Sequence, residues 1–165
     1  MQNLKTMTTL YTIASIIFSY LIGAIPFGLL FAKAFTGVDV RTVGSGNIGA
    51  TNVLRAGGKT AAALTLLADG LKGALPVLAG RHLLHEDYSA ALAGAAAILG
   101  HNFPVYLGFK GGKGVATGLG VVLATTPLIG LFCLIAWMSR WQSLQRNGAP
   151  ALVFSWAASE KPVVS

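Results

Sequence analysis

The sequence is poor in charged residues. Asp, Glu, Lys and Arg make up only 10% of its 165 residues, whereas soluble domains carry roughly 25%. Hydrophobic residues account for 54%, and the mean hydropathy is +0.67. Because so few charges cannot cover a surface that faces water, we expect lipid to be the solvent over much of the protein.

Cysteine is nearly absent as well. Cys133 is the single cysteine of the chain and lies inside an apolar run. One thiol excludes an intramolecular disulfide framework and a metal site built from cysteines. We therefore predict no structural metal and no disulfide.

Acidic residues are scarce, with five Asp and Glu against 12 Lys and Arg, so the net charge is +7 and the isoelectric point is about 9.9. Such a balance is also typical of nucleic-acid-binding proteins. Here, however, half of the basic residues cluster between apolar runs, at Lys33, Arg41, Arg55, Lys59, Lys110 and Lys113. This placement indicates membrane topology, and we predict no nucleic-acid partner.

Several apolar runs are long enough to cross a bilayer, which takes ~20 residues. Residues 6–32, 88–109 and 114–139 carry no charge. A fourth run, residues 60–80, contains only Asp69 and Lys72, which lie three residues apart and so share one helix face. We expect these two side chains to form an ion pair that faces other helices.

Two of these runs contain residues that interrupt helices. In the first run, Gly23, Pro26 and Gly28 allow a kink or a close helix approach. In the last run, the segment 125–127 (Thr-Thr-Pro) divides the run into two halves of about 12 residues each. A helix of that length reaches only ~18 Å. We therefore expect a hairpin of two helices there, and an all-α polytopic membrane bundle of about five spans. The positive-inside rule places residues 33–59 and 110–113 in the cytoplasm and residues 81–87 outside.

The loop between the first two spans, residues 44–55, is rich in glycine, hydroxyl and amide groups. Glycines let backbone N–H groups turn toward an anion, and small polar side chains add donors. Arg55 supplies a planar, bidentate charge for a phosphate. We therefore predict a phosphate-binding loop, whose candidate residues are Ser45, Asn47, Thr51, Asn52 and Arg55. The alternative is a flexible linker.

Gly44, Gly46 and Gly49 also match the glycine pattern of dinucleotide-binding proteins. That fold requires alternating strands and helices, whereas membrane-length apolar runs follow here. We reject the dinucleotide interpretation for this reason.

A second glycine-rich loop lies at the start of residues 114–139. Its candidate anion-binding residues are Lys110, Gly111, Gly112, Lys113 and Gly114. The loop precedes an expected helix N-terminus, where the helix dipole also favours an anion. It is not a Walker A loop, because Gly114 stands where Ser or Thr is required. The alternative is a basic anchor for lipid headgroups.

His101 lies about nine residues before this loop. That spacing corresponds to roughly two to three helical turns. We name it as a candidate binding residue, and the alternative is a purely structural histidine.

Together these motifs resemble the PlsY-type bacterial membrane acyltransferases. The resemblance runs from about residue 20 to residue 144 and is carried by residues 44–55, Asp69 with Lys72, Gly100 with His101, residues 109–117 and residues 140–144. It implies seven spans in the bacterial inner membrane with cytoplasmic active-site loops. It also implies functional roles for Ser45, Arg55, Lys113 and Ser143.

The family transfers an acyl group from acyl phosphate to the 1-hydroxyl of glycerol 3-phosphate, giving lysophosphatidic acid and phosphate. By resemblance, the partners are these two substrates and membrane lipid, and no cofactor is needed. Arg55 and Lys113 would bind phosphates and Ser45 would orient a substrate group. The alternative function is that of a non-enzymatic transporter or assembly subunit whose glycines serve helix packing.

The resemblance ends near Leu144. The family continues with two more spans and a motif that contains a histidine and an asparagine, whereas residues 145–165 are short and mixed. We therefore predict a membrane domain over residues 1–144 and an atypical tail over residues 145–165, caused by a frameshift or a truncation. We expect this chain to be inactive or poorly expressed, and a family-like segment appended after Leu144 to restore acyl transfer.

Overall fold

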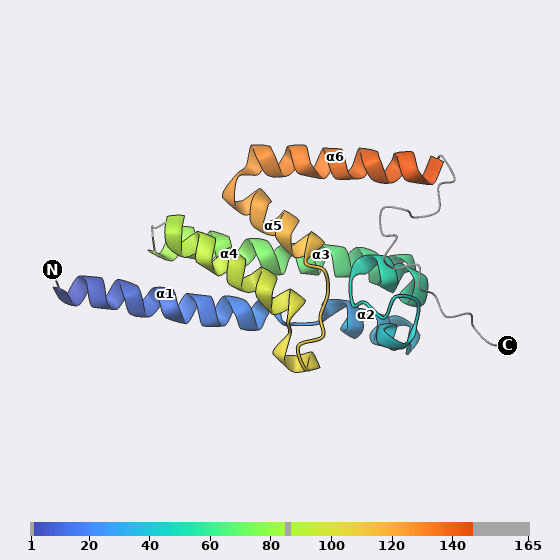
Figure 1. The fold of residues 1–165 in the computed structure, drawn as a ribbon, viewed down its shortest axis with the longest axis horizontal. Helices are drawn as coiled ribbons and strands as arrows, with labels where there is room; N and C mark the ends of the chain where they lie inside the picture. Colours follow the sequence, from blue (N-terminus) through green and yellow to red (C-terminus); the bar gives the residue numbers. More distant parts are fainter. Residues whose placement is uncertain (1, 85–86, 147–165) are drawn as a thin grey trace.

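A computed structural model describes residues 2–84 and 87–146, and these residues form a layered bundle of α-helices (Figure 1). The helices are α1 (Gln2–Gly23), α2 (Phe27–Thr36), α3 (Ala50–Leu84), α4 (Asp87–Asn102), α5 (Val115–Thr125) and α6 (Pro127–Arg146). Short 3-10 helices occupy Val40–Thr42 and Val105–Leu107. The described residues contain no strand, so the all-α prediction is confirmed and the dinucleotide-binding fold is absent from them.

Three segments are long and apolar enough to cross a membrane, namely Thr6–Thr36, Ala50–His82 and Asp87–Leu107. Two shorter apolar helices follow, Val115–Thr125 and Pro127–Arg140. These five segments overlap the four apolar runs of the sequence, the last of which is divided into two helices as predicted.

The first apolar run is broken between α1 and α2. Pro26 directly precedes α2 and has no N–H to donate to a continuous helix. A β-carbon on Gly23 would overlap the backbone carbonyl of Ala97 in α4, and one on Gly28 would overlap that of Ile48. The kink and the close approaches predicted for these glycines are therefore both present.

The last apolar run folds into the predicted hairpin. α5 ends at Thr125, and Pro127 begins α6, which runs back along the bundle (Figure 1). Arg81 closes the turn, because its Nη1 donates to the backbone carbonyls of Ala124 at 3.1 Å and Thr125 at 3.2 Å. A cation at the C-terminal end of α5 also complements the helix dipole.

Two element boundaries differ from the sequence prediction. The third run does not stay helical to residue 109, because α4 ends at Asn102 and Pro104 cannot continue it. The first glycine-rich loop ends at Gly49 rather than at residue 55, so that residues 50–55 form the first turns of α3. The helix then kinks at Gly58, whose φ is +79°.

The interior is built from small residues. A β-carbon on Gly120 of α5 would overlap the backbone oxygen of Gly70 in α3, so these two helices touch along their backbones. α1 and α4 are joined by a hydrogen bond between the Thr12 and Ser89 hydroxyls, with an O–O distance of 3.0 Å. Such close packing is typical of membrane helices, which gain no hydrophobic energy by leaving lipid. Large apolar side chains such as Phe132 face outward instead.

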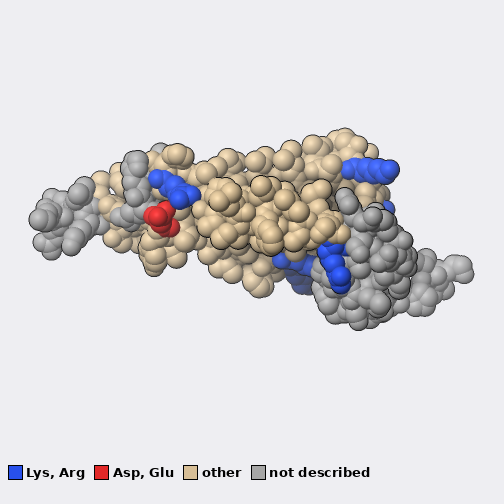
Figure 2. Space-filling view, turned by 90° about the horizontal axis from the view of Figure 1, so that it is seen from above, with Lys and Arg blue, Asp and Glu red and all other residues tan. Residues whose placement is uncertain are grey.

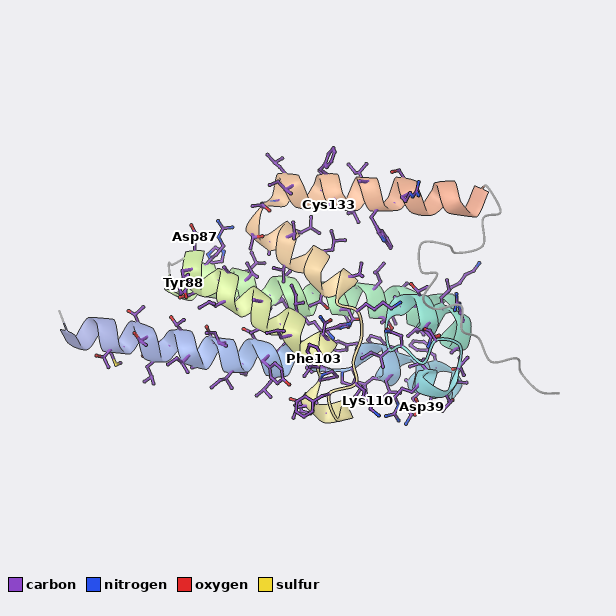
Figure 3. The ribbon with its side chains drawn as sticks, viewed as in Figure 1. Asp39, Asp87, Tyr88, Phe103, Lys110 and Cys133 are labelled. Atoms are coloured by element: carbon purple, nitrogen blue, oxygen red, sulfur yellow. The ribbon has the colours of Figure 1, made fainter. Side chains whose placement is uncertain are left out.

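Charge is distributed unequally between the two ends of the bundle. Lys and Arg side chains gather toward one end, whereas near the other end a basic side chain lies beside an acidic one (Figure 2). Asp87 and Tyr88 mark the second end, and Asp39 and Lys110 lie toward the first (Figure 3). Both glycine-rich loops are therefore at the basic end, opposite Asp87 and Tyr88.

The close contact between α3 and α5 predicts different effects for two glycines of one helix. Gly120→Ala should destabilise the protein by about 1–3 kcal/mol, because the new methyl group has no space. Gly118→Ala is the matched control, since its β-carbon would lie 4.0 Å from Ile98 Cδ1 and alanine favours a helix over glycine by ~1 kcal/mol. Thermal unfolding in detergent measures both, and equal melting temperatures for the two variants would contradict this account of the packing.

Candidate active site

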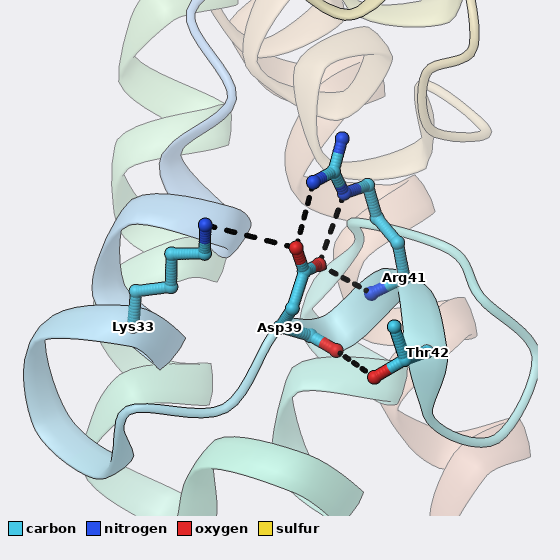
Figure 4. A network of polar contacts seen from close by, with 4 residues as sticks. All are labelled: Lys33, Asp39, Arg41 and Thr42. Atoms are coloured by element: carbon cyan, nitrogen blue, oxygen red, sulfur yellow. Dashed lines mark hydrogen bonds and ion pairs between the residues drawn. The ribbon is translucent and has the colours of Figure 1, made fainter.

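The loop between α2 and α3 is held by a carboxylate. Asp39 accepts hydrogen bonds from Arg41 Nε at 2.9 Å, Arg41 Nη2 at 2.6 Å and the Arg41 backbone N–H at 3.0 Å (Figure 4). Lys33 Nζ lies 3.7 Å from the same carboxylate. The hydrogen bonds from Arg41 hold the pKa of Asp39 well below its usual range, so the carboxylate stays charged and the 3-10 turn Val40–Thr42 stays closed at ordinary pH.

Asn52 organises the rest of this loop. Its side-chain Nδ2 donates to the backbone carbonyls of Val40 at 2.8 Å, Asn47 at 2.9 Å and Val43 at 3.1 Å. Its Oδ1 accepts the backbone N–H of Ser45 at 3.2 Å. Asn52 is also buried, so it holds the loop that carries Ser45, and its nitrogen is already engaged by three carbonyls.

The other candidate residues of the first loop lie around this asparagine. Asn47 Oδ1 accepts the N–H of Gly49 at 2.8 Å and thereby closes a turn directly before α3. Arg55 stands one turn after Asn52 on the same helix face, and a β-carbon on Gly44 would lie 3.8 Å from Arg55 Nη1. Ser45, Thr51 and Arg55 are exposed. The loop therefore presents a hydroxyl and a guanidinium to the outside.

The second glycine-rich loop folds back onto the end of α4. The backbone N–H of Gly112 donates to the carbonyl of His101 at 3.0 Å. Gly114 precedes α5 with a φ of +71°, and a β-carbon there would lie 2.6 Å from Asn102 Oδ1. Glycine is required at position 114 by the positive φ, and at position 112 because a β-carbon there would overlap His101 Nε2. The loop thus ends at a helix N-terminus, where unpaired N–H groups and the helix dipole attract an anion.

The two loops approach each other. Burial and the positive charge of nearby Arg55 lower the pKa of Lys113 below its ordinary value of 10.5. Leu107, in the turn before the second loop, packs against the buried cluster that includes Val40 and Ile48 of the first. Arg55 and Lys113 repel one another, and an anion bound between them would remove that repulsion. Lys110 is exposed in the same loop.

Beneath the second loop lies a buried cluster of charged side chains. Lys72 Nζ lies 2.8 Å from Asp69 Oδ1, and each of these two residues is only 2% exposed. The predicted ion pair is therefore confirmed. His101 Nδ1 lies 3.7 Å from the same carboxylate oxygen. The sequence does not reveal that His101 joins this pair, because the contact connects α4 with α3.

His101 lies against the second loop, as its sequence position suggests, and its side chain is buried there. It is 3% exposed, and a β-carbon on Gly112 would overlap its Nε2. The imidazole thus supports the second loop from below, while Gly111 and Gly112 are half-buried above it. Ser143 lies in α6, and its side chain is outside the described part of the chain, as is the predicted tail from residue 147 onward.

The fold and these loops define a helical membrane protein with a candidate anion-binding site at one end of its bundle. The family described as "Glycerol-3-phosphate acyltransferase" matches residues 13–157. Curated relatives with that name include one from Dinoroseobacter shibae, 49% identical over 88% of this chain and 75% of its own length. Another, from Methylorubrum extorquens, is 53% identical over 88% of this chain and 71% of its own length.

Two solved structures are similar as well. Both are of PlsY (YgiH), an integral membrane glycerol 3-phosphate acyltransferase. Its glycerol 3-phosphate form has a TM-score of 0.75 and is 40% identical, covering 89% of this chain and 82% of that one. Its lysophosphatidic acid form has a TM-score of 0.71 at 39% identity. The chain therefore belongs to the glycerol-3-phosphate acyltransferase family, and it is an integral membrane acyltransferase.

The lowered pKa of Lys113 predicts pH-dependent binding of a phosphate monoester. The ligand is a dianion above about pH 7, since its second pKa is ~6. Lys113 is cationic below its pKa and becomes neutral as the pH rises through it. As the pH is raised, the dissociation constant should therefore begin to increase at a lower pH than it would if Lys113 had the pKa of an ordinary lysine.

Two variants check this by calorimetry. Lys113→Ala should weaken binding about tenfold or more, because it removes an interaction with a charged group worth ~1.5–3 kcal/mol. Lys113→Arg should move the alkaline loss to higher pH, since a guanidinium stays charged. An unchanged pH profile in Lys113→Arg would show that another group titrates.

Proposed function

We propose that the protein acylates the 1-hydroxyl of glycerol 3-phosphate, with an acyl phosphate as the donor, and that lysophosphatidic acid and phosphate are the products. The observation that carries this proposal is the approach of Arg55 and the Lys113 loop to each other at one end of an apolar bundle. A small phosphate dianion fits two converging cations and a glycine-rich helix N-terminus. Relatives bearing the acyltransferase name, and PlsY forms with glycerol 3-phosphate and lysophosphatidic acid, support the same substrate and product.

The proposed chemistry requires mainly positioning. In an acyl phosphate the carbonyl carbon is already electrophilic and phosphate is a good leaving group. The substrate hydroxyl attacks that carbon, the bond from the carbon to the phosphate oxygen breaks, and the hydroxyl proton leaves with phosphate or solvent. Arg55 and Lys113, with the N–H groups near Gly112 and Gly114, would hold the phosphate of the acceptor, and the same charges would stabilise the departing phosphate. No metal or organic cofactor is needed for this balance.

Ser45 is assigned a positioning role rather than that of a covalent nucleophile. A nucleophilic serine needs a base within hydrogen-bond reach. The His101 imidazole lies between Asp69 and Gly112 and is buried there. The exposed Ser45 hydroxyl is instead suited to orient a phosphate oxygen or the attacking hydroxyl. The further candidates Asn47, Thr51, Lys110 and Ser143 complete the proposed binding surface.

We also propose that the acyl chain enters from the bilayer and that both loops face the cytoplasm of a bacterial inner membrane. The basic residues at the end of the bundle that carries the loops support this orientation. A transporter usually places its polar groups near the bilayer midplane. Loops at one end of the bundle, together with membership of an enzyme family, argue against the non-enzymatic alternative.

Acyl transfer can be tested with purified protein, palmitoyl phosphate and labelled glycerol 3-phosphate. The chain is assayed beside a version in which a relative's C-terminal segment follows Leu144, because the resemblance associates further active-site residues with that segment. We expect labelled lysophosphatidic acid from the extended version. Lys113→Ala should raise the KM for glycerol 3-phosphate about tenfold or more. Arg55→Lys should also raise this KM, because an ammonium group lacks the planar fork of a guanidinium.

The charge-matched control is Lys59→Ala, which removes an exposed lysine from the same end of the bundle and should leave the KM unchanged. If neither version forms lysophosphatidic acid, the proposed reaction is wrong. If Lys59→Ala is as impaired as Lys113→Ala, general surface charge explains the effect and the assignment of Lys113 is wrong.

The proposed orientation is tested by cysteine labelling in a Cys133→Ala background. Tyr88→Cys and Lys110→Cys both alter exposed side chains, and Tyr88 is 71% exposed. In inverted membrane vesicles, a membrane-impermeant maleimide should label residue 110 directly and residue 88 only after detergent is added. Labelling of both positions before detergent would contradict the topology.

A further inference from the structure

Asp69, Lys72 and His101 form a buried charge cluster. A contribution to folding stability does not explain why these charged residues are buried. A buried ion pair gives up so much hydration that apolar replacements of similar volume are often equally stable or more so. Ionisable residues within membrane helices are rare for the same reason and usually serve a function. These three side chains are 2–3% exposed, so they touch no bulk solvent and no freely diffusing substrate.

One arm of the cluster leads to the first loop. Lys72 Nζ donates to the carbonyl of Ile25 at 2.8 Å and lies 5.6 Å from the centre of the Phe27 ring. Ile25 stands in the break between α1 and α2, where helix hydrogen bonding is interrupted, and Phe27 begins α2. The next residue, Gly28, packs directly on the carbonyl of Ile48. Lys72 therefore fixes the helix on which the Ser45 loop rests.

The other arm leads to the second loop. His101 Nδ1 is buried, and among the described residues it has no hydrogen-bond partner. The Asp69 carboxylate, 3.7 Å away, is the charged group that this nitrogen faces. On the opposite side of the ring, Nε2 lies against Gly112, whose N–H donates to the His101 carbonyl. Asp69 therefore sets the orientation of the ring that supports the residue next to Lys113.

We propose that Asp69, Lys72 and His101 are positioning residues that fix the spacing between the Ser45–Arg55 loop and the Lys113 loop. This inference rests on the proposed function, because it concerns the same phosphate-binding site. The carboxylate of Asp69 connects the two loops. It pairs with Lys72, whose Nζ binds the chain at the start of α2. It also orients His101, whose ring supports Gly112. When the charges of the cluster are removed, both loops should still form, but the distance between them is no longer fixed.

The main test replaces both charges together. Asp69→Leu with Lys72→Met keeps the side-chain volumes similar and leaves no unpaired charge, so the variant is expected to fold. His101→Phe is a second variant, which keeps a ring against Gly112 but removes Nδ1. The control is Ser89→Ala, which removes the buried hydroxyl contact between α1 and α4. Each variant of the full chain is measured for its melting temperature and for its dissociation constant with glycerol 3-phosphate.

We expect the variants of the cluster to lose affinity without a matching loss of stability. The charge-pair replacement and His101→Phe should weaken glycerol 3-phosphate binding about tenfold or more with little loss of melting temperature, since small misplacements of a site have large effects. Ser89→Ala should lower the melting temperature and leave the affinity unchanged. In a Lys113→Ala background, the charge-pair replacement should cost much less affinity than in the native sequence, because it acts through the Lys113 loop.

Two outcomes overturn the proposal in different ways. If the unaltered chain binds glycerol 3-phosphate and the charge-pair variant binds it equally well, or loses affinity only in proportion to its melting temperature, the positioning role is wrong and the proposed function stands. If neither the unaltered chain nor the version with a relative's C-terminal segment binds glycerol 3-phosphate, the proposed function fails and the positioning role fails with it.

Discussion

The structure depends on the close approach of helix backbones. In lipid, apolar side chains gain nothing by leaving the solvent, so helices must associate through dispersion contacts at short range and through polar contacts. Gly120 against Gly70 and Gly23 against Ala97 supply the short range. Thr12 with Ser89 and Arg81 with the end of α5 supply the polar contacts. The loops that form the candidate site occupy positions that this packing determines.

Local chemistry made much of the fold predictable. The break at Pro26 follows from a missing N–H, and the hairpin at Pro127 follows from two half-runs too short to cross alone. The Asp69–Lys72 pair follows from a three-residue spacing on one helix. In each case the deciding residues are neighbours in the sequence, so no knowledge of the tertiary structure is required.

The differences arise where distant residues meet. Thr51, Asn52 and Arg55 were expected in a loop, yet they begin α3, because Asn47 caps the turn and Asn52 is buried among carbonyls of the preceding loop. Likewise, the sequence suggests His101 as a binding residue but cannot show that it lies beneath Gly112 and beside Asp69. The sequence identifies which residue types gather near an anion, whereas the fold decides which of them face it and which support the others.

The two ends of α5 differ in the groups that compensate the helix dipole. Arg81 donates to the carbonyls of Ala124 and Thr125 and so neutralises the negative end of the helix dipole. At the other end, Gly114 offers no side-chain cap, which leaves the positive end directed toward the second loop. Among the described residues no side chain caps this end of α5, so an anion bound in the second loop would complement the positive end of the helix dipole. With phosphate bound in the second loop as proposed, the dipole of α5 is complemented only while the phosphate is present, so phosphate binding and release would change the electrostatics of this membrane helix.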